Sequence, residues 1–338
     1  MTLPRIAITL GDPAGIGPEI ALKAALAPEV RALCRPLLFG DRSALAAHAA
    51  ACGITAHIES IATAAAATWR DERVTLVELA QFKPGELAIG KVAAAHGRAA
   101  LDSARAAIAA ALAGEVDAVV AAPQTETAIE RAGIAFDGYP GFVARCTGVA
   151  EEDAFLMICF ERGASPASMT EVRIVHTTLH VSLRRAIDLI TRERVAQAIR
   201  STHRALRRFG IAAPRIAVSG LNPHAGEGGL FGDEETKVIA PAIAGIQAEG
   251  IAAEGPFGAD TMFLKSGYDA YLVMVHDQGH ITAKIQAFDR SAGITIGTPV
   301  LFSSVAHGSA LDIAGGNRAN PGAMVAAIRR LAGASRPA

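Results

Sequence analysis

The sequence lacks an excess of charge of either sign. Its 338 residues carry 32 Lys and Arg against 33 Asp and Glu, which leaves a formal net charge of −1 at pH 7. A chain with this balance and with no basic run has no general attraction for nucleic acid or for an anionic membrane surface. We therefore expect neither of them as a partner.

Long apolar runs and paired cysteines are also missing. No apolar segment reaches the ~20 residues that cross a bilayer, and the first segment, MTLPRIAITLGDP, has too short an apolar run for a signal peptide. The cysteines Cys34, Cys52, Cys146 and Cys159 form no CxxC pair. Because this usage is typical of a reducing compartment, we predict a cytoplasmic protein.

What the sequence does contain is an alternation of apolar strands and helices. Hydrophobic residues make up 51% of the chain. We predict strands at 5–10, 35–40, 116–122, 172–177, 215–219 and 271–275, and helices at 18–26, 41–51 and 94–113, with Asp41 capping the second helix. This order is typical of an α/β fold with largely parallel, buried sheets, and the length favours two domains.

Residues with chemical potential follow the ends of these strands. Asp12 follows the first strand, and His180, His224 and His276 follow later ones. Open α/β sheets bind ligands at the carboxyl ends of their strands, and three imidazoles from separate loops suit a divalent metal. His276 and His280 would share a helix face, but the preceding strand and the intervening glycine argue against a helix there.

Glycine-rich turns carry several of these residues. LNPHAGEGG places His224 on a turn that no regular helix or strand tolerates, so we expect this imidazole to hold a ligand. GDPAGIGPE lacks the GxGxxG spacing, and Asp12 and Glu19 are equally compatible with a site and with a structural turn. GELAIGKV resembles a phosphate loop, but Val92 stands where a hydroxyl must bind magnesium, which excludes a nucleotide triphosphatase.

The most specific stretch is AHGSALDIAGGNRANP, residues 306–321. It resembles the nucleotide-binding loop of the β-decarboxylating dehydrogenases, such as isopropylmalate dehydrogenase. The resemblance implies NAD as cofactor, with His307 and Asn320 near adenine and Asp312 on the ribose hydroxyls. A carboxylate accepts hydrogen bonds from a diol and repels a 2′-phosphate. We assign Asp12 and Gly15 to the same cofactor site.

Four motifs in order, GDPAGIGPE, LNPHAGEGG, HDQG and HGSA, resemble the 4-hydroxythreonine-4-phosphate dehydrogenase family over nearly the whole chain. The resemblance implies two α/β/α domains around a cleft, with isopropylmalate-dehydrogenase-like architecture. We place an NAD-binding domain at 1–122 plus 285–338, and a metal, substrate and dimerisation domain at 123–284. It also implies a homodimer whose metal site lies at the subunit interface.

The same resemblance assigns the metal ligands and a substrate-binding lysine. His180, His224 and His276 would hold one divalent ion, with zinc preferred and cobalt, nickel, iron, manganese and magnesium left open. Lys284 would bind the substrate, and the candidate catalytic residues are Lys284, Asp260 and Asp277. The native metal, the general base and the subunit that supplies each histidine stay open.

The sequence departs from the family pattern at substrate-binding positions. A His-Thr pair becomes Tyr139-Pro140, an asparagine becomes Gly293, and an arginine before the HG loop becomes Phe302. An arginine fork suits phosphate, and a phenylalanine in its place leaves a phosphate dianion poorly paired. These changes predict a substrate without phosphate.

Within the family, these features resemble the terephthalate dihydrodiol dehydrogenases, which share GYP at 138–140, GLFG at 229–232, HDQGHI at 276–281 and SSV at 303–305. The resemblance implies that NAD oxidises a cis-dihydroxy-cyclohexadiene dicarboxylate to a metal-bound β-keto acid, which loses carbon dioxide to give protocatechuate. The residues assigned to the substrate pocket are Tyr139, Lys284, His280, Ser303 and Ser304.

Two alternatives stay open. One is 4-hydroxythreonine-4-phosphate dehydrogenase itself, in pyridoxal phosphate biosynthesis, or a relative acting on another sugar-acid phosphate. The other is a non-catalytic regulator that binds NAD or a metal, against which the intact histidines and Lys284 argue.

Overall fold

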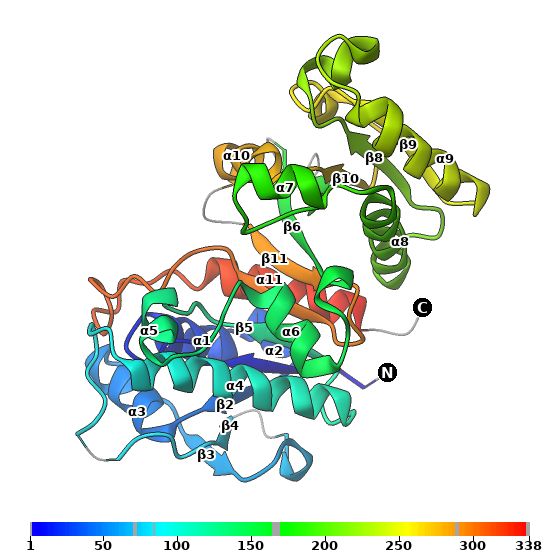
Figure 1. Cartoon of the computed structure of the whole chain (residues 1–338). Helices are drawn as coiled ribbons and strands as arrows, with labels where there is room; N and C mark the ends of the chain where they lie inside the picture. Colours follow the sequence, from blue (N-terminus) through cyan, green and yellow to red (C-terminus); the bar gives the residue numbers. More distant parts are fainter. Residues whose placement is uncertain (1, 70–72, 84, 164–169, 288–290, 336–338) are drawn as a thin grey trace. The chain divides into compact units, whose positions relative to one another are not determined.

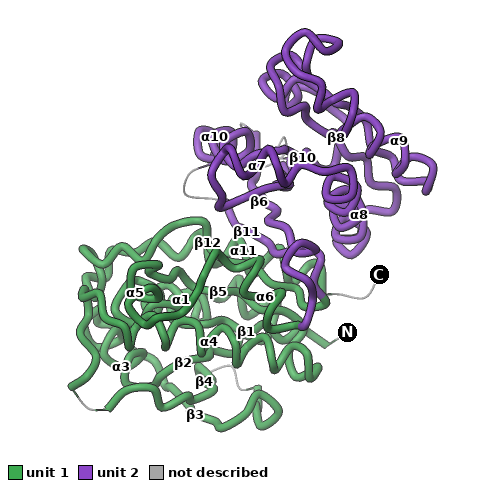
Figure 2. Tube along the Cα trace, viewed as in Figure 1, with its two compact units in different colours: residues 1–147, 299–337 green, residues 148–298, 338 purple. Residues whose placement is uncertain are grey.

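The computed structural model describes residues 2–69, 73–83, 85–163, 170–287 and 291–335. It forms two compact units, which Figure 2 colours separately: Met1–Thr147 with Pro299–Pro337, and Gly148–Thr298. We had placed the boundaries after residues 122 and 284. The units differ from this division because two helices after residue 122 pack against α4 of unit 1, and because the strand after residue 290 pairs within unit 2.

Unit 1 contains a parallel sheet with the strand order β3-β4-β2-β1-β5-β12. Its strands are β1 (Arg5–Thr9), β2 (Arg35–Gly40), β3 (Ile58–Ile61), β4 (Val74–Glu78), β5 (Ala118–Ala121) and β12 (Phe302–Val305). The central strands β1 and β5 are apolar and almost wholly buried, as expected for a sheet covered on both faces.

Helices cover this sheet. They are α1 (Gly17–Leu26), α2 (Pro28–Leu33), α3 (Arg42–Ala51), α4 (Ala94–Leu112), α5 (Glu126–Arg131), α6 (Tyr139–Thr147) and α11 (Gly322–Ala334). Figure 1 shows α4 crossing the sheet, where Leu101 and Ile108 share a buried cluster with Phe39 and Val119. The predicted cap of α3 is confirmed, because the Asp41 carboxylate accepts hydrogen bonds from two backbone N–H groups of the first turn.

Unit 2 has the strand order β11-β6-β7-β10-β8-β9. Its strands are β6 (Phe155–Arg162), β7 (Thr170–His176), β8 (Arg215–Ser219), β9 (Ala252–Phe257), β10 (Ala270–Val273) and β11 (Ala292–Ile296). Strands β7, β10, β8 and β9 are parallel, whereas β6 runs antiparallel to both of its neighbours. The prediction of largely parallel sheets therefore fails locally at β6, because too few residues separate β6 from β7 for a crossover helix.

The helices of unit 2 are α7 (Leu183–Leu189), α8 (Arg192–Arg208), α9 (Ala240–Ala248) and α10 (His276–Ala287). The expectation that no helix follows the strand before His276 was wrong, because α10 begins at His276. Gly279 suggested a break in the helix, but in the structure it lies inside α10 and allows close packing against a neighbouring strand. A Cβ atom there would lie 2.4 Å from Nε2 of His176 on β7.

The predicted α/β class is confirmed, because each unit combines a sheet with covering helices. Within the described part of the chain, no helix is long and apolar enough to cross a membrane.

Candidate active site

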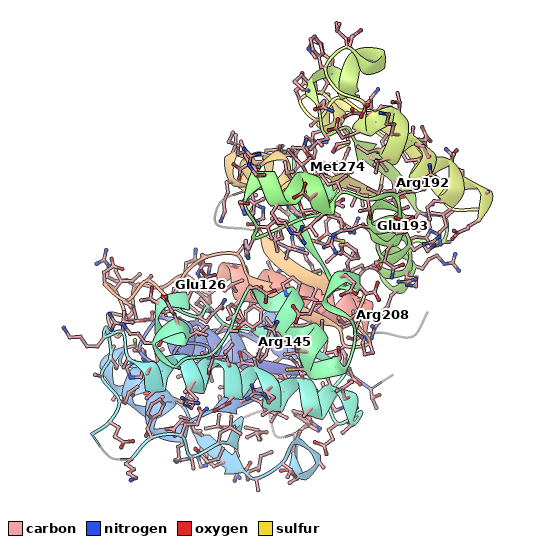
Figure 3. All side chains as sticks on the ribbon, viewed as in Figure 1. Glu126, Arg145, Arg192, Glu193, Arg208 and Met274 are labelled. Carbon is pink, nitrogen blue, oxygen red and sulfur yellow. The ribbon has the colours of Figure 1, made fainter. Side chains whose placement is uncertain are left out.

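The carboxyl ends of three neighbouring parallel strands carry the predicted metal ligands. His180 follows β7, His276 follows β10 and His224 follows β8, and these strands are adjacent in the sheet of unit 2. The ends of β7 and β10 are joined because the backbone carbonyl of Met274, labelled in Figure 3, accepts hydrogen bonds from N (3.1 Å) and Oγ1 (2.8 Å) of Thr178. The loops that bear His180 and His276 are thus fixed to each other.

Gln278 joins the ends of β10 and β8. Its Oε1 accepts hydrogen bonds from N of Met274 (2.9 Å) and N of Val275 (3.2 Å), and its Nε2 donates to the carbonyl of Gly220 (3.0 Å). Gly220 is the start of the loop that carries His224. The HDQG motif therefore contributes a structural amide as well as a histidine.

Four imidazoles gather here, and we call His176, His180, His276 and His280 the histidine cluster. The rings of His276 and His280 stack with centroids 3.7 Å apart, and the centroids of His180 and His276 are 5.7 Å apart. The structure thus brings the predicted ligands His180 and His276 together, whereas His224 follows the end of the neighbouring strand β8. Across the described ranges, no three His, Cys, Asp or Glu side chains are arranged as a metal site.

The hydrogen bonds of the cluster determine which ring nitrogens carry protons. The carbonyl of Leu156 can only accept, so Nδ1 of His176 (3.4 Å away) is the donor. Nε2 of His176 then accepts from Nδ1 of His280 at 3.1 Å. This leaves Nε2 of His280 unprotonated and able to accept a proton or a hydrogen bond.

The pKa values of His176 and His280 agree with neutral rings. Burial, followed by the proximity of His276, lowers the pKa of His280 to about 4. Burial and then His280 hold the pKa of His176 well below its ordinary value. Our sequence analysis did not single out His176. The available signal was its place at the end of an apolar strand, four residues before His180.

One face of α10 carries the other predicted groups. His276, His280 and Lys284 are four residues apart and so lie along one side of the helix. Lys284 is half-buried, and burial lowers its pKa. Asp277 is exposed, and its Oδ1 lies 2.6 Å from Nδ1 of His276, a contact that orients the ring and favours Nε2 as its ligand atom.

The loop that carries His224 has an unusual backbone. Five successive residues, 224–228, have left-handed φ angles, and three of them (His224, Ala225 and Glu227) are not glycine. Each such residue costs about 1–3 kcal/mol, so the surrounding structure must hold the loop. The His224 side chain is 64% exposed and lies 3.4 Å from the carboxylate of Glu227.

Asp260 lies near this loop. A Cβ atom built on Gly258 would lie 2.8 Å from Oδ1 of Asp260 and 3.8 Å from Cα of His224, so both residues border the same glycine. Asp260 is exposed and stays a candidate catalytic residue.

In unit 1, residues 11–19 pack against residues 306–321, and we call this pairing the cofactor-loop contact. N of Ile16 donates to the carbonyl of Ser309 at 2.8 Å, and a Cβ on Gly15 would lie 2.6 Å from Cβ of Ser309. Asp12 is fully buried and accepts a hydrogen bond from N of Ala14 at 2.9 Å. Gly15 thus permits the close contact with residue 309, whereas Asp12 holds the turn at residues 12–14.

The outer side of the same loop carries the remaining predicted cofactor residues. Asp312 and Asn320 are exposed, and His307 is half-buried with its Nδ1 3.1 Å from the carbonyl of Gly308. Oδ1 of Asn320 accepts a hydrogen bond from N of Gly322 at 2.8 Å, at the start of α11.

The positions at which the sequence was predicted to depart from the family pattern lie in regular elements. Phe302, on β12, is fully buried, and its ring centroid is 4.8 Å from that of Tyr139, which begins α6. Gly293 is buried in β11 of unit 2. Ser303 is buried in β12, and Ser304 is partly buried. Tyr139 and Phe302 are thus part of the core of unit 1.

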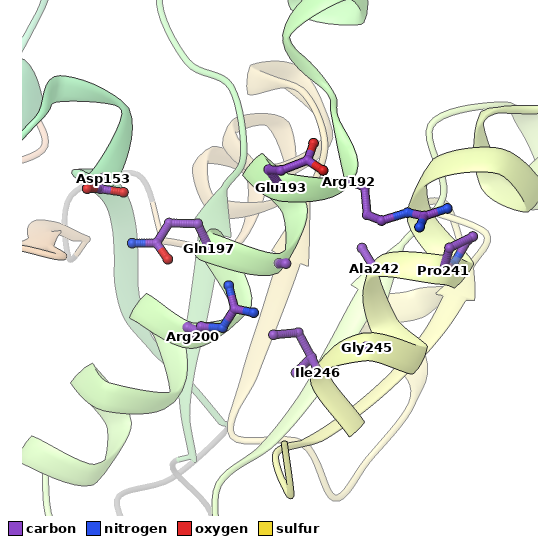
Figure 4. A pocket seen from close by; sticks show the side chains of 10 residues that line it. Asp153, Arg192, Glu193, Gln197, Arg200, Pro241, Ala242, Gly245 and Ile246 are labelled. Carbon is purple, nitrogen blue, oxygen red and sulfur yellow. The ribbon is translucent and has the colours of Figure 1, made fainter. Parts of the chain in front are cut away.

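A groove of about 430 Å³ lies between α8 and α9 (Figure 4). Its polar walls come from Asp153, Arg192, Glu193, Gln197 and Arg200. The guanidinium of Arg200 is engaged by the carboxylate of Glu249 through two hydrogen bonds. The residues that line the groove include none of the predicted site residues.

Comparisons with known proteins find relatives that match nearly the whole chain. A D-threonate 4-phosphate dehydrogenase, provisionally named, from Symbiobacterium thermophilum is 43% identical over 97% of this chain and 96% of its own length. The 1,2-dihydroxy-3,5-cyclohexadiene-1,4-dicarboxylate dehydrogenase of Comamonas sp is 40% identical over 97% of this chain and 96% of its own.

Solved structures give the same result. The 4-hydroxythreonine-4-phosphate dehydrogenase of Klebsiella pneumoniae is 34% identical, with a TM-score of 0.86 over 98% of this chain and 100% of that one. The profile of the family described as pyridoxal phosphate biosynthetic protein PdxA matches residues 32–331. The chain is therefore a dehydrogenase that belongs to the PdxA family.

Proposed function

We propose that this dehydrogenase uses NAD and a divalent metal to oxidise a secondary alcohol β to a carboxylate, and then decarboxylates the product. The observation that carries the proposal is the face of α10, where His276, His280 and Lys284 lie in line beside the ring of His180. A ligand imidazole, a neutral proton acceptor and an ammonium group are the groups that such a reaction requires.

For the metal, we propose His180, His224 and His276 as ligands. Their support is the shared strand-end edge, since all three follow the carboxyl ends of neighbouring parallel strands. One divalent ion, with zinc preferred, would supply Lewis acidity toward the substrate hydroxyl. Cobalt, nickel, iron, manganese and magnesium stay open.

We propose that the working form is a homodimer with the metal site at the subunit interface. Exposed apolar side chains lie around the histidine cluster, and large exposed apolar patches mark interaction sites. They are Val181, Leu183 and Ile187 near and on α7, and Ile281 and Ile285 on α10. A second copy of this chain would cover them and add ligands that one chain does not gather.

For the cofactor, we propose NAD on the outer side of residues 306–321. Asp312 is exposed there and suits the ribose diol, while its charge disfavours a 2′-phosphate. His307 and Asn320 would lie near adenine. Asp12 and Gly15 would act by shaping the loop on which the cofactor rests.

The proposed substrate is terephthalate cis-dihydrodiol, a 1,2-dihydroxy-cyclohexadiene dicarboxylate. Bound NAD would serve as the acceptor of the C2–H hydride, and a base of the protein would take the C2 hydroxyl proton, which would leave a ketone β to the C1 carboxylate. The bond between C1 and its carboxylate then breaks, and carbon dioxide leaves. The remaining enolate takes up a proton on its C2 oxygen, which gives aromatic protocatechuate. Lys284 would pair with one carboxylate, and Ser303 and Ser304 are candidate donors to the second. His280, with its unprotonated Nε2, would contact the substrate as an acceptor.

Two structural details support a substrate without phosphate. Phe302 is fully buried against Tyr139, so this position offers a phosphate no hydrogen-bond donor. Gly293 has no side chain with which to replace the family's asparagine. Acid–base catalysis falls to Lys284, Asp260 or Asp277, and His280 can accept a proton at Nε2.

The second candidate is oxidation of a phosphorylated hydroxy acid, such as D-threonate 4-phosphate or 4-hydroxythreonine 4-phosphate. The 43% identity to the Symbiobacterium protein favours it.

The deciding experiment measures NADH production with each of the three substrates. Charge-assisted hydrogen bonds are worth about 1.5–3 kcal/mol each, so the loss of two of them should make kcat/KM for the phosphorylated acids at least about 100-fold lower than for the dihydrodiol. A preference for either phosphorylated acid would establish the second candidate. NADP in place of NAD tests the role of Asp312 in the same assay.

A further inference from the structure

The loop that carries His224 is held by a carboxylate 11 residues downstream in the sequence. Oε1 of Glu235 accepts hydrogen bonds from N of Leu221 and N of Asn222, each at 2.7 Å, and Oε2 accepts one from Nδ2 of Asn222 at 3.0 Å. Glu235 is only 3% exposed. A buried group with three donors directed at it must act as an acceptor at both oxygens, which an ionised carboxylate does.

We propose that Glu235 is a positioning residue for His224. Its carboxylate fixes the backbone from Leu221 to Gly226 and thereby determines where the His224 imidazole meets a divalent ion. This inference rests on the metal role of His224 in the proposed function.

The carboxylate also lies close to two glycines of the loop. A Cβ atom on Gly220 would lie 3.0 Å from Oε1 of Glu235 and 2.8 Å from Cα of Ala225, and one on Gly226 would lie 2.7 Å from Oε2 of Glu235. The carboxylate therefore contacts the loop on both sides of His224. Gln278 holds the start of the loop through its hydrogen bond to Gly220, and Glu235 holds the residues that follow.

Asn222 explains why an amide cannot replace the carboxylate. Its Nδ2 donates both to Oε2 of Glu234 at 2.6 Å and to Oε2 of Glu235 at 3.0 Å. A glutamine at 235 whose oxygen faced the two backbone N–H groups would point its own NH2 at that of Asn222. Turning Asn222 over would bring its carbonyl oxygen against the Glu234 carboxylate. No orientation of the two amides satisfies every partner.

The charge state of Glu235 agrees with this role. Burial raises the pKa of its carboxyl, but the hydrogen bonds from Asn222 and the backbone outweigh burial and lower the pKa below its ordinary value. The carboxylate is therefore ionised at neutral pH. Without it, the left-handed residues 224–228 have less to hold them against relaxation to commoner backbone conformations.

The test compares Glu235→Gln with Glu249→Gln in the full-length protein. Glu249 is a matched control because its exposed carboxylate pairs with Arg200 at the end of α9, away from the loop. Hydrogen exchange of the metal-free proteins should be at least about 10-fold faster in peptides covering 219–229 of Glu235→Gln only. Titration with Co²⁺ alone, followed by its visible absorption, should give an affinity about 10- to 100-fold lower for Glu235→Gln.

The two readouts separate the possible failures. Unchanged exchange in Glu235→Gln would overturn the contact's role in fixing the loop, and faster exchange with unchanged Co²⁺ affinity would overturn the positioning of His224. If the wild-type protein binds no Co²⁺, the proposed metal role fails, and the exchange comparison still decides whether Glu235 fixes the loop. Should Glu235→Gln not fold, Asn222→Ala removes one of the three hydrogen bonds and should shift both readouts less, in the same direction.

Discussion

The cofactor-loop contact of unit 1 and the His224 loop of unit 2 use the same device in different surroundings. Each depends on a buried glutamate that accepts hydrogen bonds from backbone N–H groups of a distant segment. Glu19 accepts from N of Ala319 at 3.0 Å, as Glu235 does from Leu221 and Asn222. Lys23 reinforces the contact in unit 1, since its Nζ bonds to both Glu19 (2.6 Å) and the carbonyl of Ala319 (3.0 Å).

The surroundings of the two glutamates differ in exposure. Every residue from 11 to 20 is buried, whereas most of the residues from 223 to 231 are exposed. The contact in unit 1 is therefore part of the hydrophobic core, and substitutions there should act mainly on stability. The loop in unit 2 contributes few buried apolar contacts. If His224 binds a metal as proposed, substitutions there should act mainly on chemistry.

The largest effect should come from the ligand histidines. Replacing His224 or His276 by Ala should lower kcat/KM by more than about 100-fold, which is the upper end of the effect of losing a group that only supports a metal ligand. Because the His224 side chain is 64% exposed, its loss should change the free energy of unfolding by less than about 0.5 kcal/mol. Turnover, metal content and urea denaturation check this, with exposed His57→Ala as control. A metal-free His224→Ala protein with full activity would contradict the metal role.

The next effect concerns the exposed apolar residues around the cluster. Ile281 is 56% exposed and Ile285 is 81% exposed, and we expect a second copy of the chain to cover both. Replacing both by Glu would place unpaired charges in that interface and should yield a monomer at assay concentrations. Light scattering after gel filtration measures this, with Leu112→Glu on α4 as control. An unchanged oligomer would show that the dimer uses another face.

Much of the structure of these two units could be predicted from the sequence. The strands 35–40 and 215–219 have the expected bounds, and the candidate ligands do follow neighbouring strand ends. Both results depend on local signals, namely apolar runs interrupted by glycine and polar residues. The loops that carry the candidate metal and cofactor residues could also be identified from the sequence, because their motifs are short and continuous.

The rest depends on contacts between distant residues. The start of α10 was missed because Gly279 serves to accept the ring of His176, which lies about a hundred residues earlier. The hydrogen bond between Glu235 and Asn222 was missed because the sequence shows only three successive acidic residues after a glycine turn. The burial of Phe302 against Tyr139 likewise follows from the strand order, which no local pattern gives.

A smaller effect should follow from Glu19→Gln. The change removes the ionic partner of Lys23 and weakens the bond to N of Ala319 in a fully buried position. Hydrogen bonds to charged groups contribute about 1.5–3 kcal/mol, and we expect a loss of that order in the free energy of unfolding. Urea denaturation tests it against Glu254→Gln, an exposed partner of Arg215 that should matter less. Equal losses in the two variants would remove the distinction between the regions.

The smallest effect should be a pH dependence specific to Glu235. The pKa of its carboxyl is lowered in the folded protein from an ordinary value of 4.5, so the unfolded chain takes up the proton first as the pH falls. Its contribution to stability is therefore complete above about pH 4.5 and is lost as the pH drops toward the folded pKa. The difference in unfolding free energy between wild type and Glu235→Gln should stay constant from pH 7 to about pH 5 and shrink below that. Protonation of the histidines is common to both proteins and cancels in the difference. Urea denaturation at a series of pH values measures it, and a difference that widens toward low pH would mean that Glu235 is not held as a carboxylate.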